Sequence, residues 1–230
     1  EGVVLENQLA YWENKLEGVS ALQLPTDHAR PAIQSVAGST ISFELNKAIT
    51  TEVNALSQKE GVTPFMTLLA TFKVLMSKYS GQEDICLGTP IANRTQKELE
   101  EMIGFFVNTL ALRTQVHRES SFLELLQSVK QTTLDAYDHQ QVPFEKVVER
   151  VVKTRDMSRS PLFQVMFVLQ NTPESTQIEM DGLTISDYEA DDQVTSKFDL
   201  TIHIEEHSKD SNAGLTVDIS YCTDLYNEST

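Results

Sequence analysis

"TPFMTLLATFKVLMSKYSGQEDICLGTPIANR", residues 63–94, predicts one complete helix followed by one strand. Thr63 is a good N-cap, Pro64 suits the first helical position, and Gly81 suits the position after the last turn. "DICLGTPIANR" (84–94) then reads as a strand that runs into a turn. The apolar residues of the helix recur at helical spacing and predict a face buried in the core, made of Phe65, Leu68, Leu69, Phe72, Leu75, Met76 and Tyr79.

The chain before this stretch repeats the alternation of helix and strand. "ENQLAYWENKLEG" (6–18) carries Leu9, Trp12 and Leu16 at helical spacing and ends at a glycine. "STISFEL" (39–45) alternates as a half-buried strand does, and a second helical stripe ends at Gly61.

The chain after it continues in the same way. "IGFFVNTLALR" (103–113) is expected to be the second strand of the pair, and Ser121 with Glu124 predicts a capping box that opens a helix. A short helix is expected at 143–153, with Val147 and Val148 facing inward. The remaining strands are expected at 162–170, 183–189, 198–206 and 215–221.

Asn108 follows Phe105, Phe106 and Val107 directly within a strand-like apolar run. A buried amide without hydrogen-bond partners costs about 1 to 3 kcal/mol. Asn108 is therefore either a structural tie between the strand end and a neighbouring loop or part of a functional site.

Composition excludes several classes of function. The 230 residues carry a formal charge of −16, which argues against nucleic-acid binding because phosphate binding needs clustered Lys and Arg. Cys86 and Cys222 lie far apart without CxxC spacing, so the sequence indicates no disulfide framework and no zinc site. It also has no apolar run that would span a membrane and no secretion signal at its start, so we expect a cytoplasmic protein.

We expect the chain to be a fragment. It lacks an initiating Met and stops at "DLYNEST" (224–230), where Asp224, Asn227, Glu228 and Ser229 could each cap a helix that never begins.

No catalytic constellation is evident. The five histidines are scattered, without HExxH, an adjacent pair or metal-ligand spacing. The sequence also has no GxSxG elbow, P-loop or GxGxxG motif. We therefore predict no metal site and no catalytic residue, and expect each histidine to be a surface or cap residue.

Charge is distributed unevenly along the chain. Residues 174–210 hold eleven acidic side chains against Lys197 and Lys209, whereas residues 146–159 hold five basic against two acidic ones. This basic segment could receive an acidic partner or a phosphate, and the alternative is an ordinary solvated helix face. Lys146, Arg150 and Lys153 are expected to share the helix side opposite the valines.

Three motifs carry a resemblance to a known family. "IGFFVNTLALR" (103–113), "HQQVPFEKVVE" (139–149) and "RDMSRSPLFQVMF" (155–167) resemble, in order and spacing, core motifs of nonribosomal peptide synthetase condensation domains. The likeness spans essentially the whole chain. It implies an α/β (α+β) fold with a mixed sheet flanked by helices, as one chloramphenicol-acetyltransferase-like lobe: the C-terminal lobe (1–230) without its last helix.

The resemblance also implies the chemistry. In the intact domain an aminoacyl group on one carrier protein attacks a thioester on another, and the two lobes enclose the tunnel for both phosphopantetheine arms. The family's histidine lies in an HHxxxDG motif on the N-terminal lobe, and no HH pair occurs here. We expect this lobe to fold, to bind no cofactor itself, and to be inactive alone. Its expected partners are the N-terminal lobe, carrier proteins and an adenylation domain.

The same resemblance suggests roles for particular residues. It puts Asn108 and Thr109 near the tunnel, makes residues 91–104 a crossing (floor) loop and residues 188–198 a latch, and makes Arg155, Asp156 and Arg159 structural. Both crossings are expected to be exposed or mobile in an isolated lobe. Lys146, Arg150 and Lys153 become the candidate carrier-docking residues.

Two other classes of function stay open. One is another enzyme of the superfamily, an epimerization domain or a CoA-dependent acyltransferase, although epimerization domains differ in the 139–145 and 155–164 segments. The other is an interaction module that docks carrier or adenylation domains without tunnel chemistry.

Overall fold

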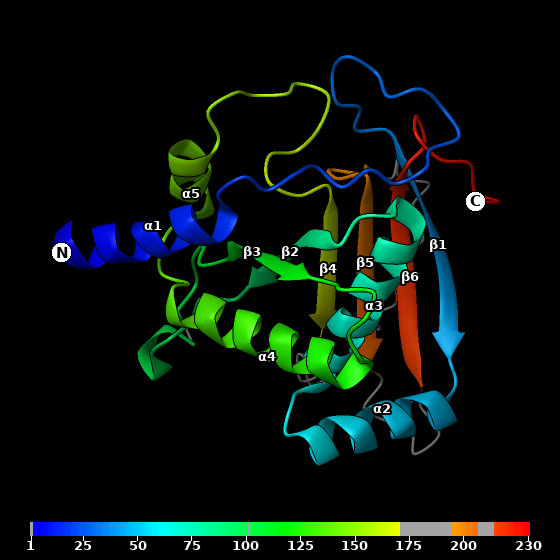
Figure 1. The fold of residues 1–230 in the computed structure, drawn as a ribbon, viewed down its shortest axis with the longest axis horizontal. Helices are drawn as coiled ribbons and strands as arrows, with labels where there is room; N and C mark the ends of the chain where they lie inside the picture. Colours follow the sequence, from blue (N-terminus) through cyan, green and yellow to red (C-terminus); the bar gives the residue numbers. More distant parts are fainter. Residues whose placement is uncertain (1, 101, 171–194, 207–213) are drawn as a thin grey trace, which may run out of the picture.

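The computed structural model describes residues 2–100, 102–170, 195–206 and 214–230, which form a six-stranded mixed sheet packed with helices (Figure 1). The strand order is β1-β6-β5-β4-β2-β3. Neighbouring strands are antiparallel except at β4, which runs parallel to both β2 and β5. The strands are β1 (Gly38–Leu45), β2 (Asp84–Ile91), β3 (Asn108–Gln115), β4 (Val165–Gln170), β5 (Leu200–Glu206) and β6 (Leu215–Cys222).

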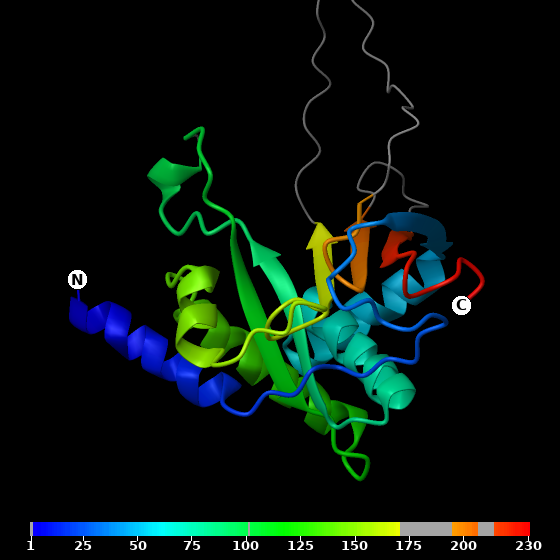
Figure 2. The ribbon, with the colours of Figure 1, turned by 90° about the horizontal axis from the view of Figure 1, so that it is seen from above.

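Four of the α-helices form two packed pairs, and α2 packs against α3. Helix α3 packs against α4 and against β2, whereas α1 packs against α5 near β3 (Figures 1 and 2). The helices are α1 (Gly2–Leu16), α2 (Lys47–Glu60), α3 (Pro64–Ser80), α4 (Phe122–Asp138) and α5 (Phe144–Val151), with a 3₁₀ helix η1 (Lys97–Leu99).

Several predicted helix ends are confirmed, although the helix expected at 143–153 ends at Val151. The Thr63 hydroxyl accepts the backbone N–H of Met66 at 3.3 Å, and Gly81 ends α3 with a left-handed φ of 71°. Ser121 and Glu124 form the predicted capping box of α4. Leu9, Trp12 and Leu16 of α1 are buried, as their spacing predicts.

The predicted core face of α3 is partly wrong. Leu75 and Tyr79 are 45% and 64% exposed. The buried stripe is instead Met66, Thr67, Leu69, Ala70, Lys73 and Met76, with a lysine at its centre. The Lys73 amine donates hydrogen bonds to the carbonyl oxygens of Ile85 (3.0 Å) and Leu112 (2.6 Å), so two strands supply the polar partners that a buried amine needs.

The second strand of the pair is shorter than predicted. β3 begins at Asn108, and residues 103–107 precede it as irregular chain. Ile103 and Phe105 are almost fully exposed. The connection from β2 to β3, which carries η1, projects away from the sheet (Figure 2). Within it the Arg94 guanidinium lies 4.3 Å from the ring centre of Phe106.

Strands β2 and β4 meet at a single residue pair, Gly88 and Met166. The ring of Phe163 occupies the space beside Gly88, because a Cβ there would lie 2.2 Å from Phe163 Cε2. Glycine therefore allows an aromatic ring to pack directly on the backbone at this junction.

Strands β4, β5 and β6 fall within the predicted segments, β6 extending one residue further, and the segment 183–189 lies outside the described residues. The C-terminal segment turns back onto the connector after α1. There the Asp27 carboxylate accepts the backbone N–H of Asn227 at 2.8 Å and the hydroxyl of Thr230 at 2.6 Å.

Candidate functional site

A groove of about 1030 Å³ is lined by the C-terminal half of α1, by α5 and by the loop that follows α5. The basic segment 146–159 and the overlapping motif 155–167 both contribute residues to its lining. Its charged lining residues are Glu13, Glu17, Glu145, Glu149, Arg150, Lys153, Arg155, Asp156 and Arg159.

Asn108 fixes the N-terminal end of α5. Its Nδ2 donates to the carbonyl oxygens of Gln140 (2.9 Å) and Val142 (2.8 Å), and its Oδ1 accepts the backbone N–H of Phe144 at 3.0 Å. Pro143 occupies the N-cap position of α5 and provides no side-chain hydrogen bond. A residue of β3 thus supplies the cap that the local sequence lacks.

These bonds engage both amide hydrogens of Asn108, as the structural alternative drawn from the sequence requires. Thr109, the next residue of β3, is half-buried.

The three basic residues do not share one free helix face. Lys146 is exposed on α5, but α5 ends at Val151 and Val152 is already extended, so Lys153 lies beyond the helix. The Arg150 guanidinium is 2.7 Å from a carboxylate oxygen of Glu6 and 3.3 Å from one of Glu13, both on α1. The expectation of a common face is wrong, because Val152 leaves the helix and α1 supplies acids opposite Arg150.

The motif 155–159 is braced internally. Asp156 Oδ1 accepts the backbone N–H of Ser158 at 2.9 Å and its hydroxyl at 2.6 Å, and these bonds lower the pKa of the Asp156 carboxyl. Asp156 Oδ2 also lies 2.8 Å from Arg159 Nε. Arg155 is exposed and forms no ion pair with any residue that the structure describes.

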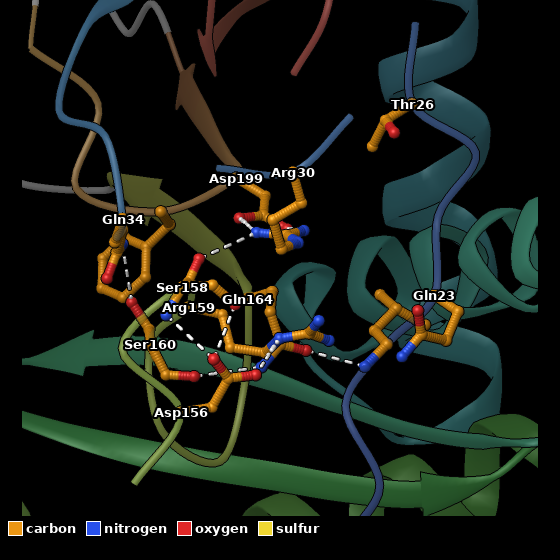
Figure 3. A network of polar contacts seen from close by, with 12 residues as sticks. Gln23, Thr26, Arg30, Gln34, Asp156, Ser158, Arg159, Ser160, Gln164 and Asp199 are labelled. Atoms are coloured by element: carbon orange, nitrogen blue, oxygen red, sulfur yellow. Dashed lines mark hydrogen bonds and ion pairs between the residues drawn. The ribbon is translucent and has the colours of Figure 1, made fainter. Parts of the chain in front are cut away.

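A second polar network, which the sequence reading missed, joins this loop to the connector after α1 (Figure 3). Arg30 makes a two-pronged ion pair with Asp199 and also donates to the Ser158 carbonyl at 3.3 Å. The Asp199 side chain is 6% exposed, and its hydrogen bonds raise the pKa of Arg30. Asp199 stands between Phe198 and Leu200 in the sequence. As with Asn108, a polar residue among apolar neighbours could have identified it as a buried side chain in need of partners.

Two glutamines extend the same network. Gln164 Oε1 accepts the backbone N–H of Leu22 at 2.7 Å, and Gln34 Nε2 donates to the Lys197 carbonyl at 2.7 Å. Gln34 also donates to the Ser160 hydroxyl at 3.2 Å (Figure 3). These hydrogen bonds connect residues that are far apart in the sequence, close to the start of β5.

The described histidines serve structural contacts. The His139 ring stacks on Tyr11 with centres 3.8 Å apart, and its Nδ1 lies 2.7 Å from the Asp135 carbonyl. His203 Nε2 lies 2.9 Å from Gln170 Oε1. Within the described part of the chain, no group of three or more His, Cys, Asp or Glu side chains could hold a metal ion, and no helix has the length and apolar composition that a membrane crossing needs.

Comparisons with known proteins agree with this geometry. A family model described as "Condensation domain" matches residues 3–230. A linear gramicidin synthase of Brevibacillus parabrevis is 48% identical over 235 residues, which cover 100% of this chain and 4% of that protein. A plipastatin synthase of Bacillus subtilis (strain 168) is 44% identical over 230 residues, covering 100% of this chain and 9% of that protein.

Solved structures show the same fold. The X-domain in complex with OxyB from teicoplanin biosynthesis matches with a TM-score of 0.86 and 26% identity over 98% of this chain and 49% of that one. Holo-AB3403, a four-domain nonribosomal peptide synthetase bound to AMP and glycine, matches with a TM-score of 0.85 and 24% identity over 97% of this chain and 18% of that one. The mixed α/β fold and the resemblance drawn from the three motifs are confirmed: this chain belongs to the condensation-domain family.

Proposed function

We propose that this chain is the C-terminal lobe of a peptide synthetase condensation domain, which forms an amide bond between groups carried as thioesters. The observation that carries the proposal is the family match over residues 3–230, together with coverage of about half of the X-domain chain. In that role β3, with Asn108 and Thr109 at its start, belongs to one wall of the tunnel, and the two carrier proteins bring their phosphopantetheine arms from outside.

The lobe would contribute shape and binding rather than the reacting histidine. Because an HH pair is absent, a general base for the attacking amine would have to come from the N-terminal lobe. The effect of this lobe on rate would then be to orient the two thioesters, which can replace much of the entropic cost of bringing them together.

The projecting connection from β2 to β3 supports a surface for that second lobe. Met102, Ile103, Phe105 and Val107 all expose more than half of their surface. Contiguous exposed apolar side chains are typical of a surface that another domain covers. We assign residues 91–104 to the crossing loop on this ground.

The latch proposed at 188–198 falls partly outside the described residues, which resume at Thr195. Thr195 forms an isolated β-bridge with Ala37, and the Ser196 backbone N–H donates to the Val36 carbonyl at 3.0 Å. The base of a latch would thus be tied to the connector after α1.

Partners follow from the same assignment. The groove lined by Lys153, together with the exposed Lys146 of α5, would receive an acidic carrier protein. An adenylation domain would adjoin the lobe, and the assembly would work in the cytoplasm.

A docking module without tunnel chemistry is the second candidate, because one similar structure is described as an X-domain in complex with OxyB. The test is to assay the chain alone and joined to the N-terminal lobe of its parent protein, with aminoacyl donor and acceptor carriers, and to detect the dipeptidyl carrier by mass spectrometry. We expect product only from the joined form. Carrier binding without product in the joined form would favour the docking module.

A further inference from the structure

Helix α1 is attached very unevenly along its length. At its C-terminal end the Arg113 guanidinium donates to the carbonyl oxygens of Lys15 (3.1 Å) and Glu17 (2.7 Å), and Trp12 Nε1 donates to the His139 carbonyl at 3.0 Å. Asp84 holds Arg113 in place with two bonds of 2.8 Å. A cation on the last carbonyls of a helix also complements the helix dipole.

In the part of the chain that the structure describes, the N-terminal half of α1 is held less firmly, with Leu5 only partly buried against the core. Val3 and Val4 are 76% and 58% exposed, and the first buried residue is Leu9. The ion pair of Glu6 with Arg150 ties these first turns to α5.

This link is of a kind that can be exchanged. The side chains of Arg150, Glu6 and Glu13 are 35%, 63% and 51% exposed, so each is already solvated. Exposed ion pairs are weak and are screened by salt, whereas separating a buried pair would leave an uncompensated charge in the interior. A carboxylate from outside can therefore replace Glu6 or Glu13 on Arg150 at little net cost.

We propose that Arg150 is shared between α1 and an acidic docking partner, so that carrier docking on α5 releases the first turns of α1. This inference rests on the proposed docking of an acidic carrier beside Lys146 and Lys153. Charge complementarity commits it to that occupant, because a released Arg150 and Lys153 line the groove and Lys146 lies exposed on the same helix as Arg150. The α1 carboxylates act as an internal competitor that lowers carrier affinity.

The coupling is reciprocal, as thermodynamic linkage requires. A change that weakens the ion pairs between α1 and Arg150 should strengthen carrier binding, and carrier binding should in turn weaken these ion pairs. The mobility of the N-terminal turns of α1 therefore depends on whether a carrier is bound to α5.

The decisive variant is Glu6→Gln/Glu13→Gln in the parent condensation domain, with Arg150→Gln as its counterpart. Glu44→Gln/Glu52→Gln, in β1 and α2, makes the same change in net charge away from α1 and is the matched control. Hydrogen exchange of the amides of residues 2–8 measures how firmly the ion pairs with Arg150 hold the first turns of α1 in the free protein. Titration with an acidic acceptor carrier at low salt measures docking.

We expect Glu6→Gln/Glu13→Gln to speed exchange at residues 2–8 and to raise carrier affinity about two- to fivefold over the control variant. Arg150→Gln should speed the same exchange but lower affinity. Adding wild-type carrier to the wild-type domain should also speed exchange at residues 2–8.

Two results would overturn the inference, and they are distinguishable. If Lys146→Glu/Lys153→Glu weakens carrier binding but Glu6→Gln/Glu13→Gln leaves exchange and affinity unchanged, the sharing of Arg150 is wrong while docking on α5 stands. If no variant on α5 alters carrier affinity, docking there is wrong and the sharing fails with it.

Discussion

Asn108 of β3 caps helix α5, because its Oδ1 accepts the backbone N–H of Phe144, a residue 36 positions later in the chain. The same amide donates to the Gln140 and Val142 carbonyls, so one side chain fixes the whole turn between α4 and α5. The orientation of α5, and with it the groove, depends on this contact.

Replacing Asn108 should destabilise the chain. Asn108→Ala leaves one buried N–H and two carbonyls without their partner, and we expect a loss of about 2 to 4 kcal/mol in the free energy of unfolding, measured by urea denaturation. Asn108→Asp should not restore it, because a carboxylate would face two carbonyl oxygens. Asn54→Ala, on the exposed side of α2, is the control. Unchanged stability with impaired use of the acceptor would instead favour the tunnel role.

Lys73 makes stability depend on pH. Complete burial lowers the pKa of its amine from 10.5 to about 7, so between pH 7 and 10.5 the unfolded chain binds more protons than the folded one. Stability should therefore rise with pH in this window, whereas below pH 7, where Lys73 is protonated in both states, Lys73 should add no pH dependence. From pH 7 to 9 the gain is about 2 to 3 kcal/mol.

The measurement is the free energy of unfolding at several pH values for the wild type, Lys73→Met and Lys78→Met. Only Lys73→Met should flatten the profile between pH 7 and 9. The comparison is limited to pH 7 to 9, because burial raises the pKa of Cys86 to about 12 and that of Tyr11 to about 12. Above pH 9 both groups oppose the rise of stability with pH. Parallel profiles for all three proteins would contradict the assignment.

Sequence patterns predict the parts of this fold that local chemistry determines. Thr63, Gly81 and the Ser121–Glu124 box set helix ends through bonds within a few residues, so their positions follow from the sequence. The buried face of α3 could not be predicted in the same way. Lys73 is an ordinary surface residue until the Ile85 and Leu112 carbonyls, from two later strands, meet its amine.

The candidate site shows the same division. The sequence identifies Asn108 as a polar residue in need of partners, but the partners lie in a loop more than 30 residues away. It also places positive charge at Arg150 without indicating that α1, over 130 residues earlier, carries the opposing acids. Long-range pairing of this kind depends on topology, which no local pattern contains.

The Arg30–Asp199 pair should behave as a partly buried ion pair. The side chains of Arg30 and Asp199 are 20% and 6% exposed, so Arg30→Met or Asp199→Asn leaves one charge without its partner at a largely buried site. Each variant should lower the free energy of unfolding by about 2 to 4 kcal/mol. The double variant Arg30→Met/Asp199→Leu should cost less than the two single losses added together. A double-mutant cycle from urea unfolding measures the coupling, and additive losses would show that the pair contributes no interaction of its own.

Gly88 should tolerate no side chain. A Cβ at this position would lie 2.2 Å from Phe163 Cε2, so Gly88→Ala must displace the ring that joins β2 to β4, at a cost of about 1 to 3 kcal/mol. Phe163→Leu should recover part of that loss when combined with Gly88→Ala. Gly2→Ala, where a Cβ meets nothing within 4 Å, should leave the unfolding midpoint unchanged. Equal effects at Gly2 and Gly88 would contradict the packing argument.

The exposed apolar side chains of the crossing segment should matter only when a second lobe is present. Ile103 and Phe105 bury almost nothing in this chain, so Ile103→Ser/Phe105→Ser should change its stability by less than about 0.5 kcal/mol. In the parent protein, where we propose that the N-terminal lobe covers them, burial of each apolar side chain contributes about 1.5 to 3 kcal/mol, and the double variant should lower the melting temperature clearly. Ile33→Ser is the control in this chain and in the parent protein, because Ile33 is 71% exposed in the connector after α1. A parent protein as stable with the two serines as without them would show that the crossing segment stays in solvent there too.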